Sequence, residues 1–361
     1  IEAVITALAI ERGVVPPTGG LEEPDPECAA LRHVTRAEPR PIGAAISSSF
    51  GFGGMDTALV LGARDRVAPG ARKRRSVVVT GIAAVTPAGI FHGTDVADLF
   101  AAPEGAAVSI PDGALDPDKA RRLDRTSRMG AVACGGALAP AASLPGAERT
   151  GVVLGIAFGA VDATAEFMRR LRDKGARMVR PADFPSLVPS SPAGYVSIYL
   201  GLGGPALVVA DLAASGECAV AQAYELVAAG DVDRMCAGAV EERSAIVEEV
   251  LSLVFGGVSA GSARREGGAA LALASADGGA PAIAELGEVL SFREAEGADA
   301  LASLPPPPEG AVVVLGTPRA GELLAGSSWS ACPRIVAPEI CGAHEAAGSV
   351  GIALAAAKVG R

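Results

Sequence analysis

The side chains that most often do chemistry are few and scattered in this chain. Its six cysteines form no Cys-x-x-Cys pair, so buried, reduced thiols in a cytoplasmic protein are the expected interpretation. Of its three histidines, His33 and His92 are expected at the surface or in loops rather than in a catalytic role. Asp231 and Asp233 flank a valine between a predicted helix and a predicted strand, where a solvated turn is more typical than a metal site. No metal site is therefore predicted.

Composition and charge exclude several classes of protein. Half of the 361 residues belong to the hydrophobic set and 46 are glycine, which suits a large, tightly layered α/β core. The net charge of −10 disfavours a general nucleic-acid binder. No apolar run is long enough to span a bilayer, and no charged-then-apolar signal segment opens the chain. We therefore expect a cytoplasmic protein without nucleic-acid or membrane partners.

The first 63 residues predict a helix followed by a two-stranded hairpin. Apolar residues recur at helical spacing over 1–10, and Gly13 and Pro16-Pro17 end that pattern. Residues 44–49 and 58–61 are strand-like, with a glycine-rich turn at 50–54 between them. Residues 64–75 carry six basic residues and no apolar periodicity. This stretch indicates an interdomain linker or, alternatively, a docking patch for an acidic protein.

From residue 76 onwards the sequence alternates between predicted strands and helices. Runs of β-branched or small apolar residues predict strands at 76–81, 151–155, 208–210, 234–239, 269–273 and 312–315. A turn at 86–89 is expected to lead into a helix that runs toward Phe100, and residues 218–229 have helical spacing. Such an alternation predicts a layered α/β domain with buried sheets.

The two ends of the chain resemble each other. Residues 346–355 repeat the pattern of the helix that Ile1 begins, and both chain ends fall inside helical patterns. We interpret the chain as a fragment of a tandem protein with three parts. Residues 1–63 are the C-terminal part of one domain, 64–75 are a basic linker, and 76–361 are the N-terminal and middle part of a second, similar domain.

Several sequence blocks resemble, in the same order, those of the β-ketoacyl-acyl carrier protein synthase family. In the first part the blocks are GVVPPT at 13–18, LEEPDPEC at 21–28 and SSSFGFGG at 47–54. In the last part they are VVVTGIAAVTPAG at 77–89, LDRTSRMG at 123–130, VPSSPAGYVSIYLGLGGP at 188–205 and AGAVEE at 237–242. The resemblance implies a thiolase-like five-layer α/β/α/β/α fold, here incomplete at both chain ends, and a protein that is usually dimeric.

That resemblance also implies that the second domain has lost its nucleophile. In the family, a cysteine at a helix N-terminus accepts the acyl group as a thioester. Counting from Gly204-Pro205 places this position at Ala213, which cannot form a thioester. Cys218 lies five residues later, more than one helical turn away, so it cannot take the same place without a shift.

The remaining catalytic positions of the family are also substituted. Two histidines, one oriented by a lysine, stabilise the enolate that forms when a malonyl thioester is decarboxylated. The resemblance places the histidines at Leu315 and Gly342 and the lysine near Ala337. His344 lies two residues from the second position and would need an insertion to serve there. We therefore predict no catalytic residue and no condensation in the second domain.

The glycine-rich turn of the first part corresponds to the gate of the acyl pocket in the family. The resemblance makes Phe52 the gating aromatic and places Gly51, Gly53 and Gly54 around it as substrate-binding positions. Phe50 is expected in the core as the packing partner of the gate.

The leading hypothesis is a fatty-acid or polyketide condensing enzyme, which joins an acyl thioester to malonyl-acyl carrier protein with loss of CO₂. In it, an active first domain is fused to a second that resembles a chain length factor. The expected partners are an acyl carrier protein and a ketosynthase, in a homo- or heterodimer. No cofactor is expected, because phosphopantetheine of the carrier protein holds the substrates.

Four alternatives stay open at this point. One is an ordinary fatty-acid elongating synthase, or a piece of a modular polyketide synthase, in which Ala213 is a local oddity; another is a degenerate remnant. A third is a non-enzymatic scaffold that binds acyl carrier protein through the basic residues Arg72, Lys73, Arg74 and Arg75. The fourth is a permuted arrangement, in which residues 46–61 pair beside the sheet of 76–361.

Overall fold

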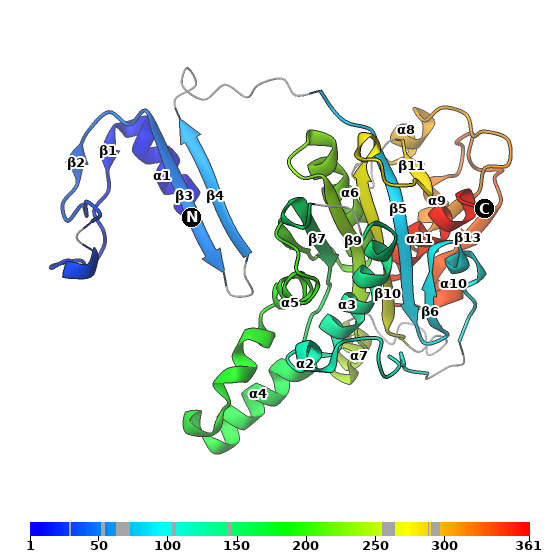
Figure 1. The fold of residues 1–361 in the computed structure, drawn as a ribbon, viewed down its shortest axis with the longest axis horizontal. Helices are drawn as coiled ribbons and strands as arrows, with labels where there is room; N and C mark the ends of the chain where they lie inside the picture. The colour runs from blue at the N-terminus through cyan, green and yellow to red at the C-terminus, as the bar shows by residue number, and fades with distance from the viewer. Residues whose placement is uncertain are drawn as a thin grey trace. The chain divides into compact units, whose positions relative to one another are not determined.

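The chain divides into two compact units. The computed structural model describes all residues except 29, 52–54, 63–72, 103–105, 143–145, 255–263, 288 and 290–296. Ile1–Arg72 form the smaller unit and Lys73–Arg361 the larger one (Figure 1). The boundary between them falls inside the basic run at 64–75.

The smaller unit contains the predicted helix and the predicted hairpin. Helix α1 (Glu2–Arg12) ends at Gly13, whose φ of 61° is the left-handed conformation that glycine adopts most easily. Strand β1 (Val14–Val15) pairs with β2 (Glu38–Pro39), and β3 (Ala44–Gly51) pairs antiparallel with β4 (Met55–Gly62). The hairpin forms a sheet of its own, so the expectation that residues 46–61 pair beside the larger sheet is wrong.

The smaller unit buries none of its described residues. Large apolar side chains remain exposed on the hairpin, among them Ile46, Phe50, Leu59 and Val60. A helix and a two-stranded hairpin without a shared core have little to offset the entropy lost on ordering. The predicted core position for Phe50 is accordingly wrong in this unit, because that side chain is 81% exposed.

The larger unit is built on a seven-stranded mixed sheet. Its strands are ordered β11-β5-β10-β9-β7-β8, with β6 paired to β5. The strands β5, β7 and β10 are buried along their whole length. The bounds of all seven are β5 (Val77–Thr86), β6 (Gly89–His92), β7 (Thr150–Gly155), β8 (Ala206–Val209), β9 (Arg234–Glu241), β10 (Gly267–Ser275) and β11 (Ala284–Leu286).

Helices cover both faces of this sheet, and a second sheet lies beyond one of them. Helices α3 (Arg125–Leu138) and α5 (Ser191–Leu200) pack on one face, and α6 (Ser215–Ala229) and α11 (Ala347–Val359) on the other. Helix α11 also contacts β12 (Val313–Leu315), which pairs in parallel with β13 (Arg334–Val336). The short helix α9 (Ala320–Leu323) lies against β12. The layers therefore alternate between helix and sheet (Figure 1).

Further α-helices belong to the larger unit. They are α2 (Pro117–Ala120), α4 (Val161–Lys174), α7 (Ala245–Val254), α8 (Gly297–Ala302) and α10 (Ala337–Cys341). Among the described residues, no helix combines the length and the apolar character needed to cross a bilayer.

The predicted helix toward Phe100 is replaced by a strand and a 3-10 helix at Gly93–Asp98. After the turn, Ile90 and Phe91 pair with Val85 and Ala84 of β5. Gly89, with φ of 140°, permits the sharp reversal. The chain thus gains hydrogen bonds to a buried strand, a tertiary advantage that local helical spacing does not reveal.

Candidate functional site

The segment predicted as the former nucleophile loop connects β8 to α6. A single 3-10 turn at Leu212–Ala214 joins them. The hydroxyl of Ser215 accepts from the backbone N–H of Asp211 and donates to the carbonyl of Leu212, which closes the loop. Leu212 has φ of 43°, the only positive value at a non-glycine residue in the described part of the chain. Strain of this kind costs on the order of 1–2 kcal/mol.

Neither Ala213 nor Cys218 supplies a nucleophile to this loop. Ala213 lies in the 3-10 turn and its methyl group is exposed. Cys218 lies on α6, and its Sγ donates to Oδ2 of Asp211 at 3.3 Å. Burial, followed by this hydrogen bond to Asp211, raises the pKa of the Cys218 thiol to about 11. Cys218 is therefore protonated, and weakly nucleophilic, at neutral pH.

The two predicted histidine positions hold residues that fit their surroundings tightly. Leu315 ends β12 and is buried against α9. Gly342 follows α10 with φ of 89°, and a Cβ built there would collide with the side chain of Arg265. That arginine is held in place by a 2.6 Å hydrogen bond from its Nη1 to the carbonyl of Ala102. The structure therefore has no room for an imidazole at position 342.

The two other candidate catalytic positions, Ala337 and His344, are both buried. Ala337, at the predicted lysine position, is the first residue of α10 and is fully buried. His344 is 8% exposed, and neither ring nitrogen has a hydrogen-bond partner. Burial, followed by the positive charge of Arg264, lowers the pKa of His344 to about 3. His344 is therefore a neutral side chain at physiological pH.

A buried ionic network, which local sequence patterns do not reveal, lies next to these positions. Glu241 ends β9 and accepts hydrogen bonds from the backbone N–H groups of Ala157, at 2.9 Å, and Phe158, at 3.2 Å. Arg264 donates to Glu345 and has its Nη2 3.9 Å from Oε1 of Glu241. Burial raises the pKa of Glu241 to about 7. The network thus ties the loops after β7 and β9 to residues 342–346.

The predicted gate is only partly visible. Gly51 is the last residue of β3. Phe52, Gly53 and Gly54 lie outside the described residues.

The basic run is not a free docking surface at its C-terminal end. Arg74 forms a two-pronged ion pair with Glu225 and has its guanidinium carbon 5.7 Å from the Tyr224 ring centroid. Arg75 pairs with Asp233, which also accepts from Arg149. Residues 231–233 form the expected turn between α6 and β9, and the Asp233 side chain stays 47% exposed while its carboxylate pairs with the two arginines.

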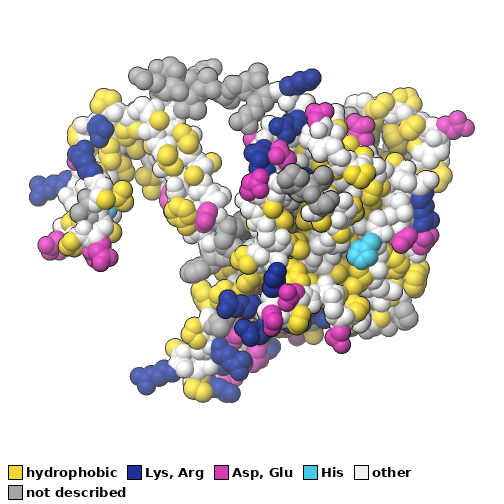
Figure 2. Space-filling view, viewed as in Figure 1, with side chains coloured by type: hydrophobic (Ala, Val, Ile, Leu, Met, Phe, Trp, Pro, Cys, Tyr) yellow, Lys and Arg dark blue, Asp and Glu magenta, His cyan; other side chains and the backbone are white. Residues whose placement is uncertain are grey.

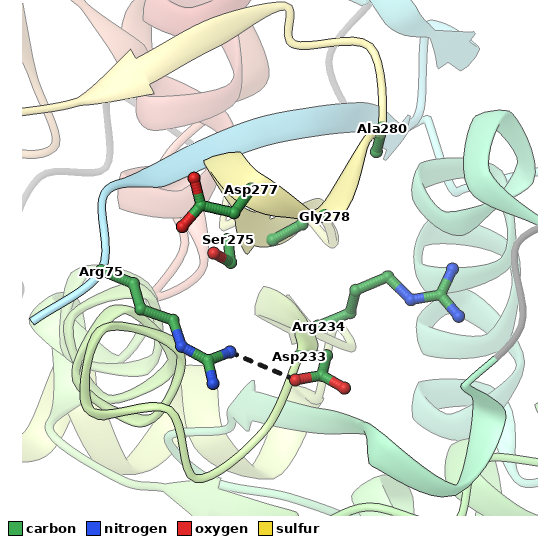
Figure 3. Close-up of a pocket in the computed structure, with 8 residues that line it drawn as sticks. Arg75, Asp233, Arg234, Ser275, Asp277, Gly278 and Ala280 are labelled. Atoms are coloured by element: carbon green, nitrogen blue, oxygen red, sulfur yellow. Dashed lines mark hydrogen bonds and ion pairs between the residues drawn. The ribbon is translucent and has the colours of Figure 1, made fainter.

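Two surface pockets of the larger unit carry charged groups. One has a volume of about 470 Å³, and Figure 3 shows Arg75, Arg234 and Asp277 among its lining residues. The other, of about 450 Å³, is more basic and also aromatic. It is lined by Asp118, Lys119, Arg121, Arg122, Leu123, Tyr195, Ile198 and Tyr199. Figure 2 shows further lysine and arginine side chains over α4.

Comparisons with known proteins agree with this architecture. Residues 112–256 match the family model described as β-ketoacyl synthase, N-terminal domain. The 3-oxoacyl-[acyl-carrier-protein] synthase 2 of Staphylococcus aureus is 34% identical over 130 residues, which are 35% of this chain and 32% of the relative. The chain thus spans about a third of the length of that relative.

Two solved structures share the fold at low sequence identity. A β-ketoacyl synthase from Burkholderia phymatum STM815 aligns with a TM-score of 0.65 and 21% identity, over 78% of this chain and 85% of that chain. The PfaC ketosynthase–chain length factor aligns with a TM-score of 0.73 and 16% identity, over 98% of this chain and 48% of that chain.

The alternation of helical layers and sheets, together with these structural likenesses, defines a thiolase-like α/β fold, as the sequence predicts. Residues 112–256 are thus similar in sequence to the N-terminal domain of β-ketoacyl synthases.

Proposed function

We propose that the larger unit is a non-catalytic condensing domain, comparable to a chain length factor, and that it acts beside a catalytic ketosynthase. The observation that carries the proposal is the alanine at residue 213, an exposed loop residue to which the sequence assigns the nucleophile position. A methyl group cannot accept an acyl chain, so a thioester cannot form there. Condensation of an acyl group with malonyl-acyl carrier protein would then require the nucleophile of the ketosynthase.

The residues around the former site suggest that catalysis was lost through several substitutions and not through the change at Ala213 alone. Arg265 occupies the space that a side chain at Gly342 would need. Ala337 is fully buried, so a lysine could not be placed there without repacking. The high pKa of Cys218 argues against a displaced nucleophile.

The smaller unit fits the C-terminal part of a separate β-ketoacyl synthase domain. Its helix α1 repeats the sequence pattern of α11, which suggests two copies of one architecture in tandem. Its exposed hairpin side chains, such as Ile46 and Phe50, would be covered by the rest of such a domain. The alignment of the PfaC ketosynthase–chain length factor over 98% of this chain is consistent with that order.

An acyl carrier protein is the proposed partner, and its phosphopantetheine would carry the substrates without a further cofactor. The basic pocket that contains Lys119, Arg121 and Arg122 suits an acidic carrier protein by charge. Arg74 and Arg75 are less suited, because carboxylates of the same unit already bind them. Strand β8 is an edge strand of the main sheet, which offers a place for the dimer partner. We propose a cytoplasmic location.

The decisive experiment tests acyl transfer to the larger unit. The full chain is incubated with radiolabelled hexanoyl-acyl carrier protein, and covalent label is sought after denaturation. We expect no hydroxylamine-labile acyl group on residues 73–361. A labile acyl group on Cys218 or any other residue of this unit would contradict the proposal.

Docking of the carrier protein is tested separately. Charge reversal by Lys119→Glu with Arg122→Glu should weaken carrier-protein binding by at least about tenfold and reduce its salt dependence. Lys358→Glu, at an exposed position near the C-terminal end of α11, is the matched control and should leave binding unchanged. Equal weakening in both variants would show that net charge, and not this pocket, governs the interaction.

A further inference from the structure

Glu217 is an unusual residue in the first turn of α6. It lies four positions after Ala213, and the inward-facing residues that follow it, Ala219, Val220 and Ala223, are buried and apolar. Its Oε2 is shielded from solvent and has no hydrogen-bond partner. A buried carboxyl oxygen without a partner is costly, so a packing advantage or a function must accompany it.

Two glycines from distant segments make room for this carboxyl group. Gly316 directly follows Leu315 after β12, and Gly348 belongs to the first turn of α11. A Cβ built on either glycine would overlap the carboxyl group of Glu217, well inside the 3.0 Å limit that real Cβ atoms respect. The carboxyl group is therefore enclosed between the loop after β12 and the start of α11.

These two segments are the ones that flank the former catalytic positions. Leu315 stands at one predicted histidine position, and Gly348 ends the block that fixes the other. The carboxyl group of Glu217, on the helix that follows the predicted nucleophile loop, thus lies against both segments. Burial raises the pKa of Glu217, and a hydrogen bond from its own backbone N–H opposes this shift.

We propose that Glu217 is a built-in occupant of the former thioester site, which keeps acyl and malonyl thioesters out of the larger unit. The proposal rests on the proposed function, since it explains how a non-catalytic domain avoids sequestering the substrates of its partner. The absent nucleophile prevents acyl transfer to the larger unit, and the Glu217 carboxyl group in addition prevents binding of the thioester. Substrates are thereby left to the catalytic partner.

The test measures binding of a thioester analogue to the full chain. The probe is S-acetonyl-N-acetylcysteamine, a ketone that has the shape of an acyl thioester but cannot transfer its acyl group. Binding is followed by saturation-transfer NMR across a concentration series. Wild type should show no saturable binding of the probe. Glu217→Ala should bind it with a dissociation constant at least tenfold lower than that of any residual binding by wild type.

Two matched variants separate volume from charge. Glu217→Gln keeps the volume and should exclude the probe as wild type does. Gly348→Ala in the Glu217→Ala background returns a methyl group to the opened space and should abolish binding again. Glu217→Thr provides a second opening variant, and thermal unfolding establishes that each variant is folded.

Several results would overturn the proposal. These are equal binding by wild type and Glu217→Ala, binding by Glu217→Gln, and absence of binding by both folded opening variants. Failure of both opening variants to fold would show that the carboxyl group serves packing alone, which also overturns it. The test involves no carrier protein and no acyl transfer, so its failure is distinguishable from failure of the proposed function.

Discussion

The guanidinium carbon of Arg264 lies 5.4 Å from the centroid of the Phe158 ring, while the same side chain donates to Glu345. The two contacts join a loop that follows β7 to the segment that precedes α11. Arg264 is 8% exposed, so the charge is largely shielded from water. The relationship makes Arg264 the central cation of the buried network.

Loss of Arg264 should destabilise the larger unit strongly. Arg264→Met leaves Glu241 and Glu345 buried without their cation, which costs about 3–5 kcal/mol of unfolding free energy. Denaturant unfolding measures the change. Arg243→Met is the control, since its pair with Glu248 is more exposed and should contribute less than about 1 kcal/mol. Equal effects of the two substitutions would contradict a special role for the buried network.

Stability should depend on pH through Glu241. Its folded-state pKa of about 7 lies above the ordinary glutamate value of 4.5, so the folded state binds the proton more tightly. The resulting stabilisation is fully present below about pH 4.5 and is lost as pH rises through 7. Relative to Glu241→Gln, the wild type should lose about 3 kcal/mol across this range. Parallel curves of unfolding free energy against pH would show that Glu241 does not titrate there.

Cys218 should react slowly with iodoacetamide at pH 8 because its thiol is protonated. Cys28 is exposed and provides a reference within the same molecule. Asp211→Asn removes the carboxylate that stabilises the thiol form, so labelling of Cys218 should accelerate by about threefold or more. Mass spectrometry of the two peptides follows both rates. A Cys218 rate that is insensitive to this substitution would assign its protonation to burial alone.

Leu212→Gly should stabilise the protein by about 1 kcal/mol, because glycine adopts a φ of 43° without strain. Little apolar burial is lost, since Leu212 is 58% exposed. Ala221→Gly, in the interior of α6, should instead destabilise by about 0.5–1 kcal/mol. Thermal unfolding of both variants provides the comparison. A destabilised Leu212→Gly variant would mean that the contacts of the leucine side chain stabilise the fold by more than its backbone strain destabilises it.

The buried strands could be predicted from the sequence because their apolar runs are short and bounded by turns. Thr150–Gly155 and Arg234–Glu241 are examples, and both strands lie at the centre of the main sheet. The strand Gly89–His92 could not be predicted from its local sequence, because its extended conformation depends on pairing with β5. The count from Gly204-Pro205 that assigns the nucleophile position to Ala213 stays a prediction.

Contacts between residues that are far apart in the chain could not be predicted from the sequence. Arg264 and Glu345 are 81 positions apart, and nothing in their local patterns pairs them. Glu217 is one of two acidic residues in its helix, so its type alone gives no signal, and the glycines beside its carboxyl group lie about 100 or more positions further along the chain. Arg74 and Arg75 belong to a run that reads as a linker, yet they bind Glu225 and Asp233.

Four glycines of the central sheet bear on the history of the gene. At Gly151, Gly155, Gly238 and Gly268, the place of a Cβ is taken by a backbone carbonyl oxygen of a neighbouring segment. Nearly every amino-acid change within one nucleotide of a glycine codon introduces a larger side chain, so unselected drift would erase these positions early. On the proposed function, the presence of all four in a unit with alanine at the assigned nucleophile position fits a protein selected for its shape rather than for its own catalysis.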